Sequence, residues 1–282
     1  MASDYRGVTA LVTGASKGLG RALALELAGR GARLILVARS EGKLRDLATE
    51  IRERHGGQDA EVIVGDLTAA NGAQQILQEL SARGLTVDLL INNAGAGDAG
   101  AFLQRPLEPQ LRTIELNIAG LLALTHAIGG DLAARGSGGI INIASVAAFV
   151  PLPFQATYAA SKAFVLSLSE ALAEELRGTG VHVMAAHPGP ISTGFFDGTT
   201  AKMQAGADTP EWIAARTLDD YAKRRPASYP GRLQYRVVTL LGRLLPRVTT
   251  ARLTGTVNRR LGYDKVVDAP GVDDDQRPPS LA

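Results

Sequence analysis

Tyr158 and Lys162 are the two side chains whose types and spacing point most directly to chemistry. They lie four residues apart in the run YAASK, and positions i and i+4 share one face of a helix. The residues that follow, 163–180, carry a helical pattern, so the phenol and the ammonium are expected side by side. A nearby cation lowers the pKa of a tyrosine, normally about 10, by roughly 1–3 units towards the range useful for general acid–base catalysis. On its own, the pair also fits a plain helix face with a half-buried tyrosine.

Two further polar residues stand where they could join this pair. Ser145 follows the apolar run 139–144, which is typical of a buried strand, and a strand end facing a helix start could place its hydroxyl beside Tyr158. Ser145 could then hold a substrate oxygen while Tyr158 passes a proton. Asn117 lies within a long helical pattern, 107–135, where its low helical propensity is unfavourable. A buried asparagine must find hydrogen-bond partners, so a bent helix, a bound water and a functional role all stay open.

A glycine cluster near the N-terminus has the setting of a phosphate-binding loop. Residues 8–13 predict a buried strand and 21–30 predict a helix, with Gly14, Gly18 and Gly20 between them in TGASKGLG. Glycine permits a tight turn and a close approach of the backbone to a phosphate, and a helix N-terminus offers unpaired N–H groups. A tight strand-to-helix turn without a ligand has the same spacing and remains the alternative.

The end of the second predicted strand, 33–38, indicates which dinucleotide the chain would bind. In NAD-binding units an acidic residue near this point binds the adenosine ribose. Here Arg39 follows instead, so a guanidinium is available to pair with a 2′-phosphate, and Lys17 adds a second positive charge. The sequence therefore predicts NADP(H) over NAD(H), unless Arg39 merely caps the strand. Asp66 follows a third strand, 60–64, and could reach an adenine amino group or N-cap the next helix.

Strands and helices alternate along the chain, with further strands predicted at 87–91 and 181–186. This order predicts an α/β fold, a Rossmann-type doubly wound parallel sheet with helices on both faces. Ligands bind such sheets at the carboxyl ends of the strands. The features that follow predicted strands are the Gly14 turn, Arg39, Asp66, Asn92, Ser145 and the Pro188 turn. So many polar or glycine features on one edge favour a functional site over any single structural explanation.

Together these motifs resemble the short-chain dehydrogenase/reductase family over roughly residues 5–195. The matching segments are TGASKGLG at 13–20, NNAG at 92–95, Asn117, Ser145, YAASK at 158–162 and HPGPIST at 187–193. The resemblance implies that Tyr158 is the acid/base and that Lys162 lowers its pKa and binds the nicotinamide ribose. It further implies that Ser145 orients the substrate oxygen and that Asn117 holds a helix distortion and a proton-relay water.

The same resemblance implies an NADP(H) site. Its glycines would cradle the cofactor, Asp66 would bind adenine, Asn93 would line the cleft and Thr193 would meet the nicotinamide carboxamide. The full set of expected cofactor contacts is Gly14, Ser16, Lys17, Gly18, Leu19, Gly20, Arg39, Asp66, Leu67, Asn93, Ala94, Gly95, Tyr158, Lys162, Pro188, Gly189, Ile191 and Thr193.

The expected substrate is an apolar carbonyl compound. Phe149 and Phe154, in the apolar stretch 147–154, and Phe195, in a segment that resembles the family's mobile lid, are expected to contact it together with Ser145. Nothing charged there invites a carboxylate or phosphate, so a ketone or 3-oxoacyl group is favoured, although these side chains could simply pack the loop. The same residues could oxidise a hydroxy compound such as a 3-hydroxy acid, and a non-catalytic NADP(H)-binding scaffold is a further alternative.

The C-terminal part carries a basic amphipathic segment. No Asp or Glu occurs from 223 to 263, and Arg232, Arg236 and Arg243 fall on one stripe of a helix that Pro246 should end. The adjoining leucine face could pack on the domain, on a second subunit or on an anionic membrane surface. The segment also resembles C-terminal extensions of long-chain 3-oxoacyl reductase relatives. The predicted organisation is a dinucleotide-binding and catalytic domain (1–228), a basic helical extension (229–263) and a disordered tail (264–282).

Composition excludes several other classes. A net charge of +2 argues against a globally basic nucleic-acid binder, and the absence of cysteine excludes disulfides and thiolate chemistry. The four histidines show no metal-ligand spacing, so no metal is expected. No apolar run reaches the roughly 20 residues of a membrane span, so a cytoplasmic protein is expected, with a peripheral membrane contact through 229–263 left open. By resemblance we expect a homodimer or homotetramer, with helices 107–135 and 155–179 available for pairing.

Overall fold

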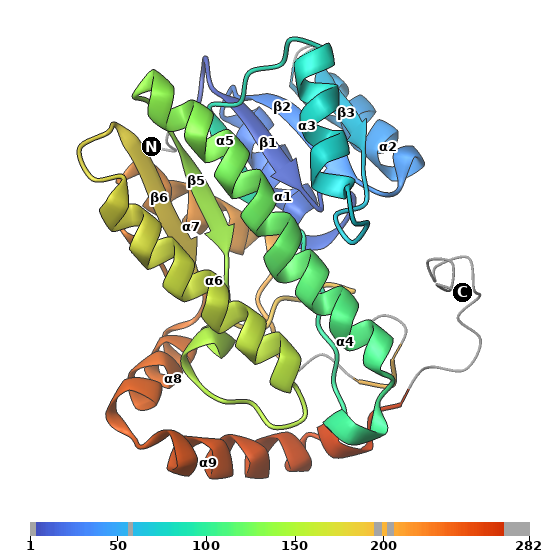
Figure 1. The fold of residues 1–282 in the computed structure, drawn as a ribbon, viewed down its shortest axis with the longest axis vertical. Coiled ribbons are helices and arrows are strands. Elements are labelled where there is room, and N and C mark those ends of the chain that lie inside the picture. Colours follow the sequence, from blue (N-terminus) through green and yellow to red (C-terminus); the bar gives the residue numbers. More distant parts are fainter. Residues whose placement is uncertain (1–3, 56–58, 195–198, 202–205, 268–282) are drawn as a thin grey trace.

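A seven-stranded sheet, parallel throughout, forms the centre of the computed structural model, in the order β3-β2-β1-β4-β5-β6-β7 (Figure 1). The structure describes residues 4–55, 59–194, 199–201 and 206–267, except for the side chains of Leu241 and Arg243. The strands are β1 (Thr9–Thr13), β2 (Arg33–Ala38), β3 (Ala60–Val64), β4 (Leu89–Asn92), β5 (Gly138–Ile143), β6 (Val181–Ala186) and β7 (Ala227–Ser228). The strand order reverses between β1 and β4, and ligands of doubly wound sheets bind at such a point.

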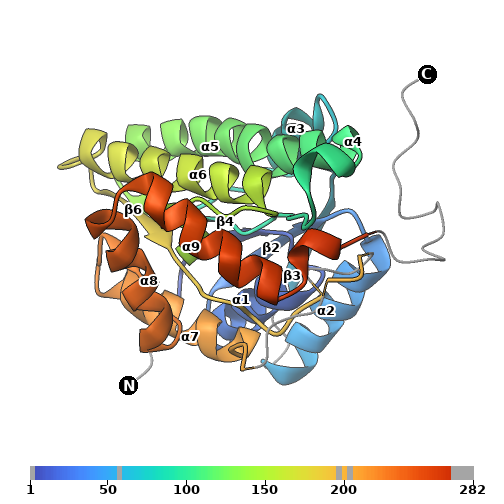
Figure 2. The same cartoon turned by 90° about the horizontal axis from the view of Figure 1, so that it is seen from below.

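Helices cover both faces of the sheet, as the continuous apolar strands require. The helices of the described residues are α1 (Gly18–Gly29), α2 (Glu41–Arg54), α3 (Gly72–Ala82), α4 (Leu107–Ile114), α5 (Leu121–Arg135), α6 (Ala156–Glu175), α7 (Pro210–Ala222), α8 (Leu233–Leu244) and α9 (Arg247–Arg260). Figure 2 shows α1, α2 and α7 below the sheet and α3, α5 and α6 above it. Alternate residues of each strand pack into two separate cores, one on each face of the sheet. Val12 packs towards α1, whereas its neighbour Leu11 packs towards α3 and α5. The predicted doubly wound α/β fold is confirmed.

Buried amides tie the central strands to the helices above them. Asn92 at the end of β4 donates to Asn142 Oδ1 in β5 and to Thr125 Oγ1 in α5, both at 2.9 Å. Asn142 in turn donates to Ser169 Oγ in α6 at 2.9 Å. These bonds fix the carboxyl ends of β4 and β5, where the candidate site begins.

The C-terminal part differs from the sequence prediction in two ways. The basic segment forms two helices, because Pro246 both follows α8 and occupies the N-cap of α9. The first residues of the tail that was expected to be disordered, 264–267, have a defined structure. A short 3₁₀ turn, Tyr263–Lys265, is packed on the domain, and Val266 is buried against Ala99. The remainder of that tail, from residue 268, lies outside the described residues.

One described helical stretch, Leu107–Arg135, is long and apolar enough by length and composition to span a membrane. Nearly half of its most apolar window is buried within the fold, at 44%. Leu124, Ile128 and Leu132 pack in the core between α5 and the sheet. We therefore assign this stretch to the core of the domain.

Candidate active site

Ser145, Tyr158, Lys162 and Asn117 converge at the carboxyl edge of the sheet. Ser145 follows β5 and its hydroxyl accepts a hydrogen bond from Ala147 N at 3.1 Å, which starts the 3₁₀ turn Val146–Phe149. A hydrogen bond joins the hydroxyl groups of Ser145 and Tyr158. Lys162, one turn further along α6, places its Nζ 5.9 Å from the centre of the Tyr158 ring and donates to Ile143 O at 2.8 Å. Hydroxyl, phenol and ammonium are thus brought together as the spacing predicted.

Asn117 lies in a π-helical turn, Glu115–Gly120, that interrupts the helix between α4 and α5. Its Nδ2 donates to Ala96 O at 2.8 Å and to Ser161 Oγ at 2.9 Å, and its Oδ1 accepts from Ala96 N at 2.9 Å. The expected helix distortion is therefore present. A Cβ on Gly95 would lie 3.3 Å from Asn117 Oδ1 and 3.4 Å from Lys162 Nζ, so these groups share one small space.

The pKa values of the pair differ from the sequence expectation. Burial raises the pKa of Tyr158, and the hydrogen bond with Ser145 only partly opposes this rise. Burial lowers the pKa of Lys162, which is 5% exposed, to about 8. The expected lowering of the Tyr158 pKa by Lys162 is not found, because burial of the phenol dominates and only the hydrogen bond with Ser145 opposes it.

The lowered pKa of Lys162 predicts how the stability of the fold depends on pH. Between pH 8 and 10 the unfolded chain keeps the Lys162 proton, whose usual pKa is 10.5, while the folded chain releases it at about 8. The unfolded state then binds more protons, so stability rises with pH. Relative to Lys162→Met, we expect the wild-type free energy of unfolding to rise by roughly 2 kcal/mol from pH 8 to 10 and to stay level below pH 8.

Urea unfolding of both proteins at a series of pH values measures this difference. The window ends at pH 10, because burial raises the pKa of Tyr221 to about 12 and its titration acts in the opposite sense above that point. A constant difference between the two proteins from pH 7 to 10 would show that Lys162 has an ordinary pKa.

Apart from Tyr158 and Lys162, which lie in α6, the expected cofactor contacts follow strands and lie on the same edge. They are Gly14, Ser16, Lys17, Gly18, Leu19 and Gly20 after β1, Arg39 after β2, Asp66 and Leu67 after β3, Asn93, Ala94 and Gly95 after β4, and Pro188, Gly189, Ile191 and Thr193 after β6. These stretches are linked directly. Asn93 Nδ2 donates to Thr13 O at 2.9 Å, and a Cβ on Gly18 would lie 3.1 Å from the methyl group of Thr193.

The glycine turn has the geometry of an anion cradle. Gly14 and Gly18 adopt positive φ values of 67° and 56°, which side-chain-bearing residues rarely adopt. A Cβ on Gly20 would lie 2.3 Å from Gly14 O, so the turn closes tightly onto α1. Lys17 is the N-cap of α1, and its side chain makes no cap bond to the first-turn N–H groups, which are the groups that an anion can bind.

Arg39 and Asp66 face each other across the ends of β2 and β3. Arg39 Nη1 lies 3.9 Å from Asp66 Oδ2, and the Arg39 side chain is 63% exposed. Asp66 Oδ1 accepts from Thr68 N and Thr68 Oγ1 at 2.9 and 2.8 Å, whereas α3 begins only at Gly72. The N-cap alternative for Asp66 is therefore wrong. Lys17 Nζ lies apart from this pair and donates to Gly194 O at 3.3 Å.

Two of the expected substrate contacts, Phe149 and Phe154, pack against other side chains of the protein. Phe149 is 8% exposed and packs its ring 4.9 Å from His187 and 6.1 Å from Tyr229. It therefore contributes to the packing under α8 more than to an open wall. Phe154 has a left-handed backbone, φ 69°, and lies under the Arg259 guanidinium at 5.4 Å. Phe195 lies outside the described residues.

The structure adds residues that sequence reasoning missed. Thr13 Oγ1 accepts from Asn93 N and Ala94 N at 3.0 Å each, joining β1 to the turn after β4. Ser161 accepts from Asn117, and its place inside YAASK was the only signal for it. The Asp208 carboxylate, 2% exposed, accepts from Arg232 Nε at 3.0 Å and anchors the start of α8. Nothing in the spacing of these two residues indicates that pairing.

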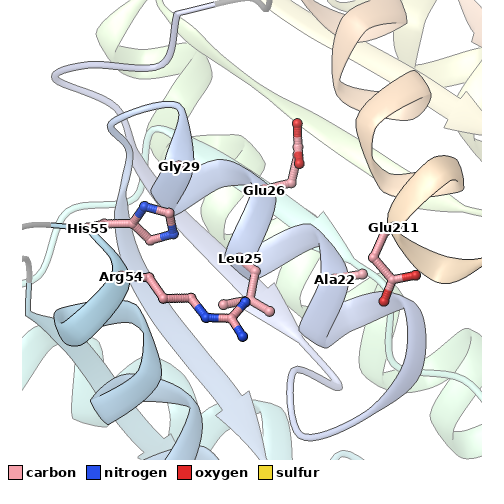
Figure 3. A pocket seen from close by; sticks show the side chains of 7 residues that line it. All are labelled: Ala22, Leu25, Glu26, Gly29, Arg54, His55 and Glu211. Atoms are coloured by element: carbon pink, nitrogen blue, oxygen red, sulfur yellow. The ribbon is translucent and has the colours of Figure 1, made fainter.

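A separate surface hollow of about 270 Å³ lies between α1, the end of α2 and the start of α7 (Figure 3). Its lining residues are Ala22, Leu25, Glu26, Gly29, Arg54, His55 and Glu211. None of them belongs to the site described above. The hollow therefore plays no part in assigning the function.

Comparison with known proteins agrees with this geometry. A family model described as short chain dehydrogenase matches residues 8–204. The chain belongs to the short-chain dehydrogenase family. As a short-chain dehydrogenase it is a member of an oxidoreductase family, and its glycine turn, Ser145 and the YAASK run all fall inside the matched region.

One curated relative and two solved structures show which members of the family this short-chain dehydrogenase is similar to. It is 40% identical over 182 residues to a very-long-chain 3-oxoacyl-CoA reductase of Pyricularia oryzae, which covers 63% of this chain and 54% of the reductase. The chain thus spans about half the length of that relative. A short-chain dehydrogenase from Sphingobium yanoikuyae, solved in complex with NADPH, shares 29% identity at a TM-score of 0.73, covering 95% and 99% of the two chains. A bulky-bulky ketone specific alcohol dehydrogenase from Comamonas testosteroni shares 28% identity at a TM-score of 0.71, covering 96% and 99%.

Proposed function

We propose that the chain is an NADP(H)-dependent reductase that converts an apolar ketone or 3-oxoacyl group into a secondary alcohol. The observation that supports this most directly is the convergence of Ser145, Tyr158 and Lys162 on the sheet edge that carries the glycine turn. A bound nicotinamide supplies the hydride for the carbonyl carbon. The chain's own residues then have to position the carbonyl and deliver a proton to its oxygen.

In this proposal Tyr158 donates its phenolic proton to the carbonyl oxygen and Ser145 holds the same oxygen. Because burial raises the pKa of Tyr158, the phenol carries its proton at neutral pH, and the loss of that proton has to be stabilised by neighbouring groups. Lys162, held by Ile143 O, stabilises the negative charge that develops on Tyr158 as its proton leaves. Asn117 positions Ser161 and the Ala96 backbone beside Lys162. Oxidation of a hydroxy compound would use the same residues in reverse, with Tyr158 as the base.

The residues present fit a phosphorylated dinucleotide. The cradle formed by Gly14 and Gly18 and the uncapped first turn of α1 suit a pyrophosphate. Arg39, exposed at the end of β2, would pair with a 2′-phosphate, while Asp66 would bind adenine. Lys17, now bonded to Gly194 O, would have to turn to join Arg39. The NADPH complex of the Sphingobium relative supports the same cofactor.

Two relatives and the apolar stretch 147–154 beside Ser145 support the proposed substrate class. One relative is named a 3-oxoacyl-CoA reductase and another a bulky ketone-specific dehydrogenase. The apolar stretch 147–154 follows Ser145 in the chain, with Phe154 as the aromatic side chain we assign to the substrate wall. Phe195 stays a prediction of the sequence alone.

Subunit pairing is a further part of this proposal. Leu107, Leu111 and Ile114 of α4 are exposed large apolar residues, as is Leu122 of α5. We propose that α4, α5 and α6 pair with a second copy to form a dimer or tetramer. Light scattering that gives the mass of one chain would contradict this assignment.

Cofactor titration of the full chain tests the proposed function first. We expect NADPH to bind at least about tenfold more tightly than NADH, which corresponds to about 1.4 kcal/mol. Apolar ketones and 3-oxoacyl thioesters should then oxidise bound NADPH. A preference for NADH would overturn the cofactor assignment and favour an oxidative role. If neither nucleotide binds, the proposed reductase function is wrong. Tight NADPH binding without turnover of any carbonyl compound would favour a non-catalytic NADP(H)-binding scaffold.

A further inference from the structure

One face of helix α8 presents apolar side chains away from the domain. Leu233, Val237, Leu240 and Leu244 recur at i, i+4, i+7 and i+11, which places them on one face. Their exposed fractions lie between 48% and 80%. The option that this face packs on its own domain is therefore wrong.

Helix α9 carries a second, shorter apolar stripe. Leu253, Val257 and the C-cap Leu261 recur at i, i+4 and i+8 and are 44% to 54% exposed. The adjoining side of α9 holds the domain through hydrogen bonds, with Thr254 Oγ1 donating to Pro151 O at 2.7 Å and Asn258 Nδ2 donating to Pro153 O at 2.8 Å. These hydrogen bonds hold α9 on the domain, and its apolar residues remain exposed even though the helix is bound there.

The domain-facing side of α8 is made of different residues. Tyr235 packs over Gly189, whose Cβ would lie 2.5 Å from the Tyr235 ring. A Cβ on Gly242 would lie 2.3 Å from Phe149 O, so this part of α8 approaches the 3₁₀ turn after Ser145 very closely. Figure 2 shows α8 and α9 together on the side of the molecule nearest the viewer. We call the exposed apolar residues of both helices, together with their exposed arginines, the α8–α9 surface.

The α8–α9 surface is strongly basic. Residues 221–263 contain nine arginines and no acidic residue. Arg247, Arg252 and Arg260 of α9 are exposed, and within the part of the chain that the structure describes none of the three forms an ion pair. An apolar face flanked by unpaired arginines needs a partner that is both apolar and negatively charged.

From this we infer that the α8–α9 surface binds an anionic lipid bilayer, lying in the headgroup region with its leucine and valine side chains inserted. A second copy of the chain fits less well, because a two-fold interface would set the same basic patch against itself with no carboxylate to pair. Spanning is excluded by length, since 14 residues of α9 rise only about 21 Å against a hydrocarbon core of about 30 Å.

The placement of this surface gives it a role in substrate access. α9 contacts Pro151 and Pro153, which lead from Ser145 to Phe154, so the docked edge is the one that carries the candidate site (Figure 1). On the proposed function, an apolar ketone dissolved in the bilayer would then enter the site from the membrane side. The docking itself does not depend on that function.

Flotation of the full chain with phosphatidylcholine vesicles, with and without phosphatidylserine, tests the inference. We expect binding only where phosphatidylserine is present, and release at high salt. Arg247→Gln/Arg252→Gln/Arg260→Gln should weaken binding about a hundredfold, because each lost charge near the surface is worth about fivefold, or about 1 kcal/mol. Leu240→Ser/Leu244→Ser/Leu253→Ser should weaken binding at low salt as well, because the inserted apolar side chains are lost while every arginine is kept.

The matched control is Arg6→Gln/Arg45→Gln/Arg177→Gln, which removes the same charge at sites that are 82%, 73% and 77% exposed elsewhere. It should bind like the wild type, and equal weakening would show that only net charge matters and would overturn the inference. A wild type that ignores phosphatidylserine overturns it as well. If the leucine variant changes the mass seen by light scattering while vesicle binding is retained, the surface is a subunit interface instead. An unchanged melting temperature of all variants confirms that the exposed changes leave the fold intact.

Discussion

Replacing Tyr158 by Phe should lower kcat for ketone reduction by about 10²–10⁴-fold while NADPH binding stays unchanged. The variant keeps the ring, its packing and its distance to Lys162 Nζ, and loses only the hydroxyl that bonds Ser145. Loss of the proton donor acts on the transition state alone, so kcat and kcat/KM should fall together. Steady-state kinetics with NADPH and an apolar ketone, alongside a fluorescence titration of NADPH, measure both quantities.

Tyr5→Phe is the matched control for this change. Tyr5 is buried, and its hydroxyl donates to Leu218 O at 2.7 Å, far from the candidate site in sequence and on the other face of the sheet. That variant should lose about 0.5–1.5 kcal/mol of stability and keep its turnover. Near-normal turnover by Tyr158→Phe would remove Tyr158 from the reaction, whatever the cofactor proves to be.

The second large effect is expected at Arg39. Arg39→Ala should weaken NADPH binding by about 10–100-fold, the worth of a charge-assisted hydrogen bond of about 1.5–3 kcal/mol, and leave NADH binding unchanged. Arg39→Asp should go further and reverse the preference, because a carboxylate repels a 2′-phosphate and accepts from a ribose hydroxyl. Paired titrations with NADPH and NADH measure the ratio directly.

Arg45→Ala provides the control for long-range charge, since Arg45 is 73% exposed on α2 and pairs only with Glu41 among the ion pairs of the described residues. Arg45→Ala removes the same charge and should leave the ratio of NADPH affinity to NADH affinity unchanged. If Arg39→Ala weakens NADPH and NADH equally, then Arg39 supports the fold of the site and does not recognise the phosphate.

Much of the fold could be predicted because local signals agree with the tertiary structure. β2, β3 and β6 occupy the predicted residues, since apolar runs bounded by glycine or polar residues leave few other solutions. β7 was missed because a pair of residues, Ala227–Ser228, carries no periodic signal and is fixed by its pairing with β6. α9 lies within the predicted helical extension, but its start as a separate helix was missed because its buried side consists of Thr250, Gly255 and Asn258, which a hydrophobic pattern cannot detect.

For the candidate site, sequence reasoning predicted correctly which side chains lie together, but it predicted the wrong direction for the pKa shift of Tyr158. The spacing of Tyr158 and Lys162 predicted their proximity correctly, because it depends only on helix geometry. The direction of the Tyr158 pKa depends on how far water is excluded, and that is set by residues distant in the chain. The pairing of Arg232 with Asp208 likewise depends on a long-range approach that no local pattern encodes.

The contacts of α9 also determine how much freedom the segment after Ser145 retains. Pro151 and Pro153 already restrict the backbone, and Thr254 and Asn258 bind their carbonyl groups. Phe154, in a conformation that costs of order 1–3 kcal/mol, is held by a hydrogen bond from Gly100 N to its carbonyl at 2.9 Å. A segment restrained in this way has little conformational entropy left to lose when a ligand arrives. Its ordering cost is met during folding, so a ligand's contacts with it count almost fully towards affinity.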